Sequence, residues 1–206
     1  DACTEMSTAT SYRSLMDGSA EDNGNPPLFW ICRKGWIEAF GRSELSLRML
    51  PALLRIATIP TIAIFALRQF GTATALLAAL LCAISPIEIE LSNEARVYAL
   101  VQFLALLSTW LFMEWMRSYR HWILVAYVFV TVLLCYSHYY ALAVPLAHSV
   151  VVIFSMPSRQ QIAWCLALGG LLIAALPWLA TFKEQVSGRL EASSSESQQW
   201  MFQLAA

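Results

Sequence analysis

Six long apolar stretches follow one another along this chain of 206 residues, and they constrain its fold more than any other feature. A helix needs about 20 mostly apolar residues to cross a bilayer. Lipid offers the backbone no hydrogen-bond partners, so each stretch is expected to be helical. The stretches lie near residues 46–67, 72–91, 97–116, 122–137, 139–156 and 161–182. The pattern predicts an all-α, polytopic transmembrane helical bundle with about six spans.

The composition excludes a soluble domain and a nucleic-acid-binding protein. Hydrophobic residues make up 58% of the chain, charged residues only 13%, and the mean hydropathy is +0.57. A soluble domain of this size exposes too much of its surface to water to accommodate such a composition. The net charge of −1 offers nothing to attract a nucleic-acid backbone. Membrane lipids are therefore the expected surroundings.

Basic residues in the short connections predict the orientation. Three short connections contain almost no acid besides Glu114, and their arginines place them on the cytoplasmic side by the positive-inside rule. These arginines are Arg68, Arg117, Arg120 and Arg159. The opposite side then holds residues 1–45, the 85–96 junction, the turn at His138 and the tail 183–206.

We treat residues 1–206 as one partial transmembrane domain. It comprises an extracytoplasmic loop with a juxtamembrane helix (1–45), the membrane spans (46–182) and an extracytoplasmic tail (183–206). The chain begins at Asp1 in a polar segment that needs an upstream span to deliver it across the membrane. We therefore expect a fragment of a longer protein, and we do not expect the fragment alone to be active.

A juxtamembrane helix is predicted within the outer loop. Asn25 is a good N-cap, Pro26 suits the first helical position, and Gly41 stops the helix after Phe40. Apolar side chains recur near helical spacing at Phe29, Cys32, Trp36 and Phe40, with Arg33, Lys34 and Glu38 elsewhere on the wheel. Such a helix lies either in the membrane interface or against the protein's own spans, and the sequence leaves both alternatives open.

The junction between the second and third apolar stretches is the strongest sign of function. Three glutamates and one arginine fall between Glu88 and Arg96, at the edge of two membrane spans. Ionisable groups at such a depth are costly and usually line a polar cavity, pathway or active site. The junction therefore predicts a site at the outer ends of these helices.

Several short motifs follow one another in a characteristic order. They are Asp1, Pro26-Pro27-Leu28-Phe29, Gly41-Arg42-Ser43-Glu44 with Arg48, Ser85-Pro86, Glu94-Ala95-Arg96-Val97-Tyr98 and Tyr136-Ser137-His138-Tyr139-Tyr140. In this order the chain resembles membrane glycosyltransferases of the GT-C type, specifically the dolichyl-phosphate-mannose–protein mannosyltransferase-like family, which includes bacterial members that use polyprenyl-phosphate sugars. It departs from the family pattern at Ala2, where an acid is usual, and at Asn25, where a histidine is common.

The resemblance implies that a sugar moves from a polyprenyl-phosphate donor to a lipid, glycan or protein acceptor. Such a transfer needs a carboxylate to take the acceptor's proton and cationic or hydrogen-bonding groups on the departing phosphate. Asp1 is the catalytic base by family position, with Glu5 as its substitute. Arg96 and Tyr98 are the implied phosphate-binding residues, and Glu94 and His138 line the site.

Each assignment has a plainer alternative. Asp1 can be a solvated loop acid or a helix cap. Arg96 can reach to lipid headgroups or pair with Glu94, and His138 can be a packing residue among its neighbouring tyrosines. A divalent metal bridged by Glu94 and His138 is an open alternative, but two ligands are too few to predict one, so no cofactor is assigned.

Two other classes of function compete with a hexosyl or pentosyl transferase. A transporter or a flippase for lipid-linked glycans also lines its path with polar residues, although here those residues gather at one membrane face. A non-catalytic membrane scaffold would not need the ordered motifs. We therefore expect an integral membrane glycosyltransferase, in a bacterial plasma membrane, with its active site on the extracytoplasmic side.

Overall fold

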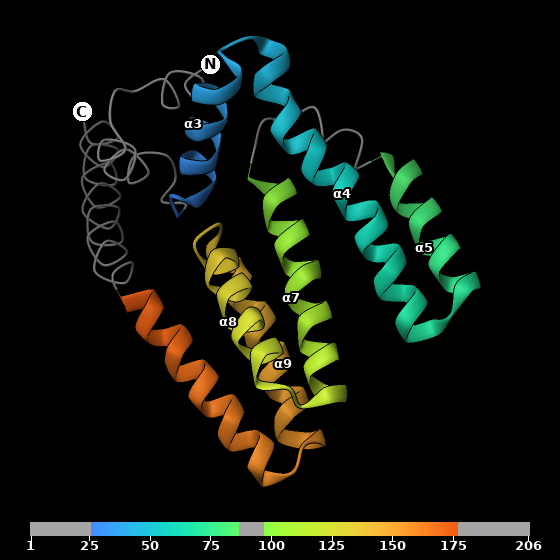
Figure 1. Cartoon of the computed structure of the whole chain (residues 1–206), viewed down its shortest axis with the longest axis vertical. Coiled ribbons are helices and arrows are strands. Elements are labelled where there is room, and N and C mark those ends of the chain that lie inside the picture. The colour runs from blue at the N-terminus through green and yellow to red at the C-terminus, as the bar shows by residue number, and fades with distance from the viewer. Residues whose placement is uncertain (1–25, 87–96, 177–206) are drawn as a thin grey trace, which may run out of the picture.

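The computed structural model describes residues 26–86 and 97–176, and every regular element in these two ranges is helical. The elements are α3 (Leu28–Phe40), α4 (Glu44–Phe70), α5 (Thr72–Ile84), α7 (Tyr98–Ser118), α8 (His121–Cys135), the short 3₁₀ helix η1 (Tyr139–Leu142), α9 (Ala143–Ser155) and a final helix, Ser158–Leu176. Figure 1 shows them as a bundle of helices connected by short turns. The predicted all-α class is confirmed.

The helices coincide with the predicted apolar stretches, but only some reach the length of a span. Within the described ranges, three helices are long and apolar enough to cross a membrane: α4 with 27 residues, α7 with 21 and Ser158–Leu176 with 19. The helices Thr72–Ile84, His121–Cys135 and Tyr139–Ser155 are shorter. About six spans were expected, and the described residues contain three of full length; α8, for example, ends at Cys135, before the polar turn that contains His138.

Local sequence sets several helix ends. Gly41 and Gly71 close α3 and α4 with φ angles of 83° and 90°, which a residue without a Cβ adopts at low cost. Ser43 caps α4, because its side chain accepts a hydrogen bond from the backbone nitrogen of Ser46 at 3.1 Å. The predicted stop of the juxtamembrane helix at Gly41 is thus confirmed.

The helices pack into two groups of buried side chains, one toward each end of the bundle. The helix α4 packs on α5 and on α7, and α7 packs in turn on α8. One group joins α3, α7, α8 and η1; it contains Phe29, Trp30, Leu100, Leu104, Val130, Leu134 and Ala141. The other joins α7, α8, α9 and the final helix; it contains Phe112, Trp115, Ile123, Leu124, Tyr127, Val152 and Trp164.

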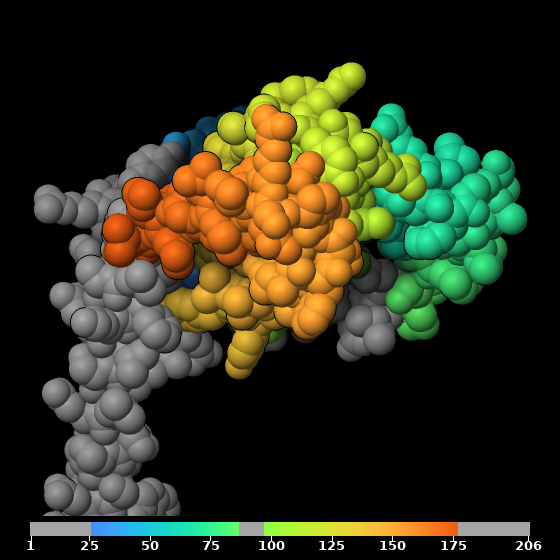
Figure 2. Space-filling view, turned by 90° about the horizontal axis from the view of Figure 1, so that it is seen from below, coloured from blue at the N-terminus to red at the C-terminus, as the bar shows by residue number. Residues whose placement is uncertain are grey.

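Large apolar side chains remain on the outside, as a lipid-facing surface requires. Seen from below, α4 and α5 project from one side of the bundle, whereas α9 and the final helix lie beside α7 (Figure 2). Along α5 the large exposed side chains are Leu76, Leu77, Leu80, Leu81 and Ile84. A contiguous apolar surface of this kind is rare on soluble proteins and indicates a membrane environment.

The helix α3 packs against the protein's own helices through a face that the sequence did not predict. Arg33 and Lys34 are buried together with Phe29, Trp30 and Ile37, whereas Cys32 and Phe40 are exposed. Of the predicted apolar stripe, Phe29 packs in the bundle and Trp36 is half-buried, with its indole nitrogen donating to the Ser46 carbonyl oxygen of α4 at 2.9 Å. The helix begins at Leu28 with Pro27 as its cap, two positions later than expected; Asn25 lies outside the described residues.

Burial of a cation on α3 has a physical basis. The Arg33 guanidinium lies 5.8 Å from the centre of the Trp30 ring, where a planar cation gains from the electron-rich face. The long stems of arginine and lysine also cover apolar surface. Such residues can therefore lie on the packed face of an amphipathic helix.

Candidate active site

The structure describes two of the six site residues predicted from sequence. Asp1, Glu5, Glu94 and Arg96 lie outside the described residues, so their roles stay predictions. Tyr98 and His138 are described, and their ring centres lie 6.2 Å apart. The structure therefore brings together the last residue of the Glu94–Tyr98 motif and the histidine of the later aromatic motif.

His138 sits in the turn between α8 and η1, and its ring is oriented by a backbone contact. Its Nδ1 accepts a hydrogen bond from the Tyr140 backbone nitrogen at 3.3 Å, which caps η1. In the neutral ring, the proton must then reside on Nε2, which becomes a donor. The Tyr140 ring stacks on the imidazole with centres 5.2 Å apart.

The surroundings of His138 favour the neutral imidazole. Partial burial lowers the pKa of His138 below its ordinary value, because the cation loses hydration. At neutral pH the side chain therefore presents an uncharged Nε2–H. Within the described ranges, neither His138 nor any other position belongs to a group of three histidine, cysteine or acidic side chains able to hold a metal.

Tyr98 is the first residue of α7, and its side chain is 43% exposed. Its position at a helix start places the phenol at the end of the bundle, beside the turn that carries His138. Tyr98 begins α7 and His138 follows the end of α8. Because α7 and α8 run in opposite directions, these two positions lie at the same end of the bundle. The sequence predicted them at the same end of the bundle for this reason.

Backbone and side-chain contacts hold α3 and the final helix at the His138 end. The Leu28 backbone nitrogen donates to the Tyr136 carbonyl oxygen at 3.1 Å, and the Tyr136 hydroxyl donates to the Ala174 carbonyl oxygen at 2.8 Å. Three segments distant in sequence therefore converge two residues before His138. Ser137 is fully buried and donates to the Leu133 carbonyl oxygen at 2.8 Å, which fixes the turn.

The buried cations of α3 are features that sequence reasoning missed. Arg33 and Lys34 lie on the helix whose N-terminus contacts Tyr136. A signal was present, because Phe29, Arg33 and Ile37 are four residues apart and so share one helix face. The packed face of α3 thus carries two cationic residues, on a helix whose first residue contacts the segment before His138.

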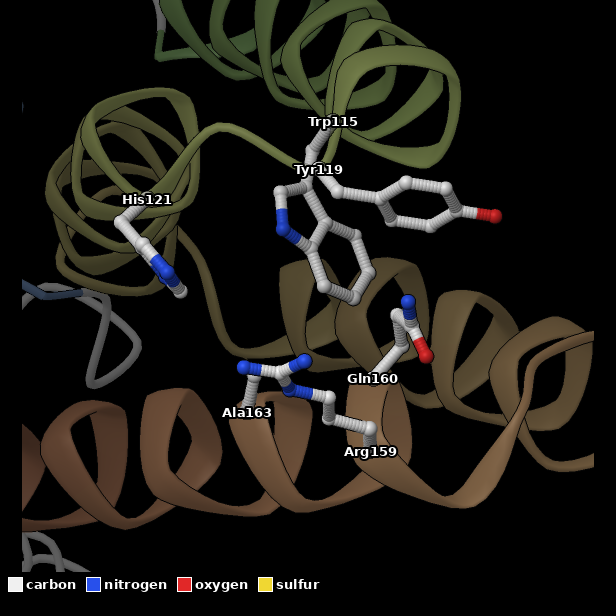
Figure 3. A pocket seen from close by; sticks show the side chains of 6 residues that line it. All are labelled: Trp115, Tyr119, His121, Arg159, Gln160 and Ala163. Atoms are coloured by element: carbon white, nitrogen blue, oxygen red, sulfur yellow. The ribbon is translucent and has the colours of Figure 1, made fainter.

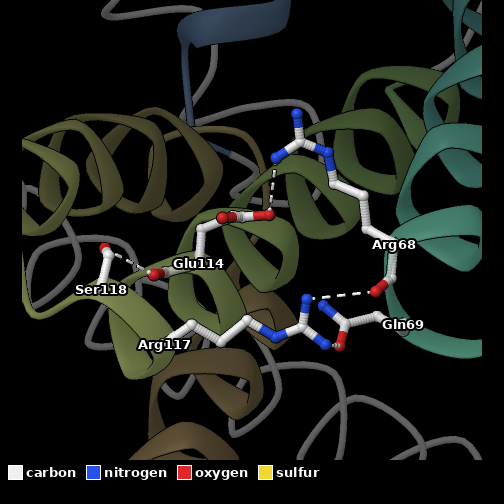
Figure 4. Close-up of polar contacts among 5 residues, drawn as sticks. All are labelled: Arg68, Gln69, Glu114, Arg117 and Ser118. Atoms are coloured by element: carbon white, nitrogen blue, oxygen red, sulfur yellow. Dashed lines mark hydrogen bonds and ion pairs between the residues drawn. The ribbon is translucent and has the colours of Figure 1, made fainter.

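The opposite end of the bundle has its own polar contacts. Arg68 at the end of α4 pairs with Glu114 of α7 at 2.9 Å (Figure 4). Arg117 donates to the Gln69 side-chain oxygen at 2.7 Å and to the Arg68 carbonyl oxygen at 3.1 Å. The arginine-containing connections therefore gather at one end, away from His138, as the sequence predicted.

A comparison with known protein families assigns the chain to one of them. Residues 24–180 match the profile of the family described as dolichyl-phosphate-mannose-protein mannosyltransferase. The chain belongs to this family. No curated protein and no solved structure matches it. The mannosyltransferase family member described here is thus an integral membrane glycosyltransferase of the GT-C type, and the match favours this class over the transporter or flippase.

Proposed function

We propose that this protein transfers a sugar from a polyprenyl-phosphate donor to a hydroxyl group of a lipid, glycan or protein acceptor, at the end of the bundle that carries His138. The acceptor oxygen attacks the anomeric carbon of the sugar. The bond from that carbon to the phosphate oxygen breaks, and polyprenyl phosphate leaves. The reaction passes through an oxocarbenium-like state, so the enzyme must stabilise charge on the leaving phosphate.

The observation that supports this assignment most directly is the approach of His138 to Tyr98. Their ring centres are 6.2 Å apart, and they belong to two motifs that are distant in sequence. A neutral Nε2–H and a phenol hydroxyl are both hydrogen-bond donors suited to phosphate oxygens. Two such donors at one end of the bundle suit the phosphate of a lipid-linked sugar, whose headgroup lies at the membrane surface.

The remaining roles are assigned by family position. Arg96, two residues before Tyr98, pairs bidentately with the phosphate, since its guanidinium remains charged. Asp1 takes the proton of the acceptor, with Glu5 as the alternative, and Glu94 lines the site.

We place this end on the extracytoplasmic side of a bacterial plasma membrane. The support is the concentration of arginines at the other end, where Arg68 and Arg117 pair with neighbouring helices and Arg120 and Arg159 add further charge. Short basic connections usually face the cytoplasm. The donor's phosphate would then meet His138 at the outer membrane surface.

Turnover of a polyprenyl-phosphate sugar by the purified full-length enzyme tests the proposal. Arg96→Ala should abolish transfer and weaken donor binding to the same extent, and Arg96→Lys should restore activity only in part. Lysine returns the charge but not the planar two-point contact. Arg120→Ala, at the other end of the bundle, is the control and should retain full turnover.

Two results would contradict the proposal. Full activity of Arg96→Ala would remove the phosphate role of this residue. Equal activity of Arg96→Lys and the wild type would instead indicate that the residue anchors a helix end, since lysine reaches lipid headgroups as well as arginine does.

A further inference from the structure

A pocket of about 190 Å³ lies at the end of the bundle opposite His138 (Figure 3). It is formed where α7 ends, α8 begins and the final helix Ser158–Leu176 begins. Its lining consists of Trp115, Tyr119, His121, Arg159, Gln160 and Ala163. One water needs only about 10–15 Å³, so this space can hold a small polar group.

The pocket contains a positively charged side chain, Arg159. The Arg159 guanidinium lies below the Trp115 indole, with His121 and Gln160 to either side (Figure 3). Across the described ranges no ion pair or hydrogen bond engages the Arg159 side chain, whereas Arg68 at the same end is paired with Glu114. His121, the first residue of α8, lines the pocket, and no side chain caps that helix, so the partial positive charge of its N-terminus lies nearby. The pocket therefore favours an anion.

The walls are rigid. Trp115 is 1% exposed and stacks on Trp164 with ring centres 5.6 Å apart. Tyr119 ends α7 in the left-handed conformation, at φ 53° and ψ 22°, and its backbone nitrogen donates to the Trp115 carbonyl oxygen at 2.8 Å. A left-handed tyrosine carries a backbone cost of about 1–2 kcal/mol, and strain of this kind concentrates at binding sites.

Gln160 adds a second requirement to the ligand. Its side-chain oxygen is buried and accepts no hydrogen bond in the described structure. A buried acceptor without a partner is costly, and a ligand that brings a hydroxyl or an N–H group would satisfy it. The ligand thus combines an anionic group for Arg159 with a nearby donor for Gln160.

We propose that this pocket binds the headgroup of a membrane glycerophospholipid, with the phosphodiester on Arg159 and a hydroxyl or ammonium of the headgroup alcohol on Gln160. Phosphatidylglycerol has both groups. A lipid is favoured over a free phosphate, because Ile162 and Leu166 follow Arg159 on the same helix with side chains that are 64% and 74% exposed. These apolar side chains can contact the acyl chains of a bound lipid. Basic pockets between membrane helices commonly bind lipid headgroups.

The test uses the full-length protein, purified in detergent and exposed to one probe at a time. Lipid retained on the protein is counted by native mass spectrometry, and stabilisation is followed by thermal unfolding. Phosphatidylglycerol should bind and stabilise. Phosphatidylcholine should bind less well, because its quaternary ammonium has no N–H group for Gln160. Inorganic phosphate should not stabilise the protein; equal stabilisation by phosphate and phosphatidylglycerol would overturn the assignment to a lipid.

Variants separate the pocket from the general basic character of this end. Arg159→Gln should weaken phosphatidylglycerol binding about tenfold or more, as expected for loss of a charge-assisted hydrogen bond. Arg120→Gln makes the same change in charge outside the pocket and should bind as the wild type does. Unchanged binding by Arg159→Gln, or equal losses in the two variants, would overturn the proposal.

Two further variants keep the test decisive if Arg159→Gln folds poorly. Ala163→Phe places a ring in the pocket and leaves every charge intact, so it should exclude the lipid. Gln160→Leu should remove the preference for phosphatidylglycerol over phosphatidylcholine. Full binding by Ala163→Phe, or an unchanged preference in Gln160→Leu, would show that the pocket is not the site.

Discussion

Replacing His138 by asparagine or by glutamine separates the two functions of its ring. An asparagine oxygen occupies nearly the position of Nδ1 and can still accept from the Tyr140 backbone nitrogen, but nothing replaces Nε2–H. A glutamine amide nitrogen reaches nearly the position of Nε2, but the contact with Tyr140 is lost. His138→Asn therefore removes the hydrogen-bond donor to the phosphate and keeps the turn contact. His138→Gln removes the turn contact and keeps the hydrogen-bond donor.

The structure sets the expected magnitudes. The contact from Tyr140 to Nδ1 is long, at 3.3 Å, so its loss in His138→Gln should cost about 0.5 kcal/mol in the free energy of unfolding, the lower end for helix caps. Loss of a donor to a developing charge typically costs about 10²–10³ in kcat. His138→Asn should therefore be stable but nearly inactive, whereas His138→Gln should be less stable and more active.

Turnover of a polyprenyl-phosphate sugar and chemical denaturation in detergent provide the two measurements. The reasoning is refuted if His138→Asn keeps wild-type turnover, because Nε2 would then not contact the donor. It is also refuted if His138→Gln is the less active of the two, because the ring would then act through the turn and not through its outer nitrogen.

Two predictions concern stability. Burial lowers the pKa of His138 in the folded protein, so the unfolded chain takes up the proton first as the pH falls. The free energy of unfolding should therefore decrease as the pH falls through about 6.5, and the decrease should be smaller in His138→Asn; identical pH profiles would contradict this. Phe29→Ala removes a ring that is 2% exposed and should destabilise the protein by about 3–5 kcal/mol in denaturant titrations. Phe40→Ala, at a position that is 60% exposed, is the matched control and should stay within about 0.5 kcal/mol.

The helices were predictable because long apolar runs indicate membrane helices and glycines indicate where helices end. The ends of α3 and α4 follow from Gly41 and Gly71, whose conformations no other residue adopts as readily. The packed face of α3 was not predictable from hydrophobicity alone. Arg33 counts as polar on any such scale, yet its stem is buried and its guanidinium lies over Trp30.

The candidate site was predictable in outline and not in its chemistry. The number of helices between Tyr98 and His138 determines that the two lie at one end of the bundle. The position of the His138 proton depends on a backbone contact from Tyr140, which exists only once the turn has its final dihedral angles. The unfilled space beside Arg159 likewise arises from the meeting of three helix ends, which no local pattern records.

The hydrogen bond between Leu28 and Tyr136 has a consequence for biosynthesis. Its acceptor is made on the order of a hundred residues after its donor, so at about 5–20 residues per second α3 waits roughly 5–20 s for α8 to emerge. During that interval Phe29 and Trp30 lack the part of their final surroundings that α8 provides, Val130 and Leu134, and the membrane interface is a nearby apolar environment for them. The two positions considered for α3 are then successive stages: it rests on the lipid first and joins the bundle when α8 arrives.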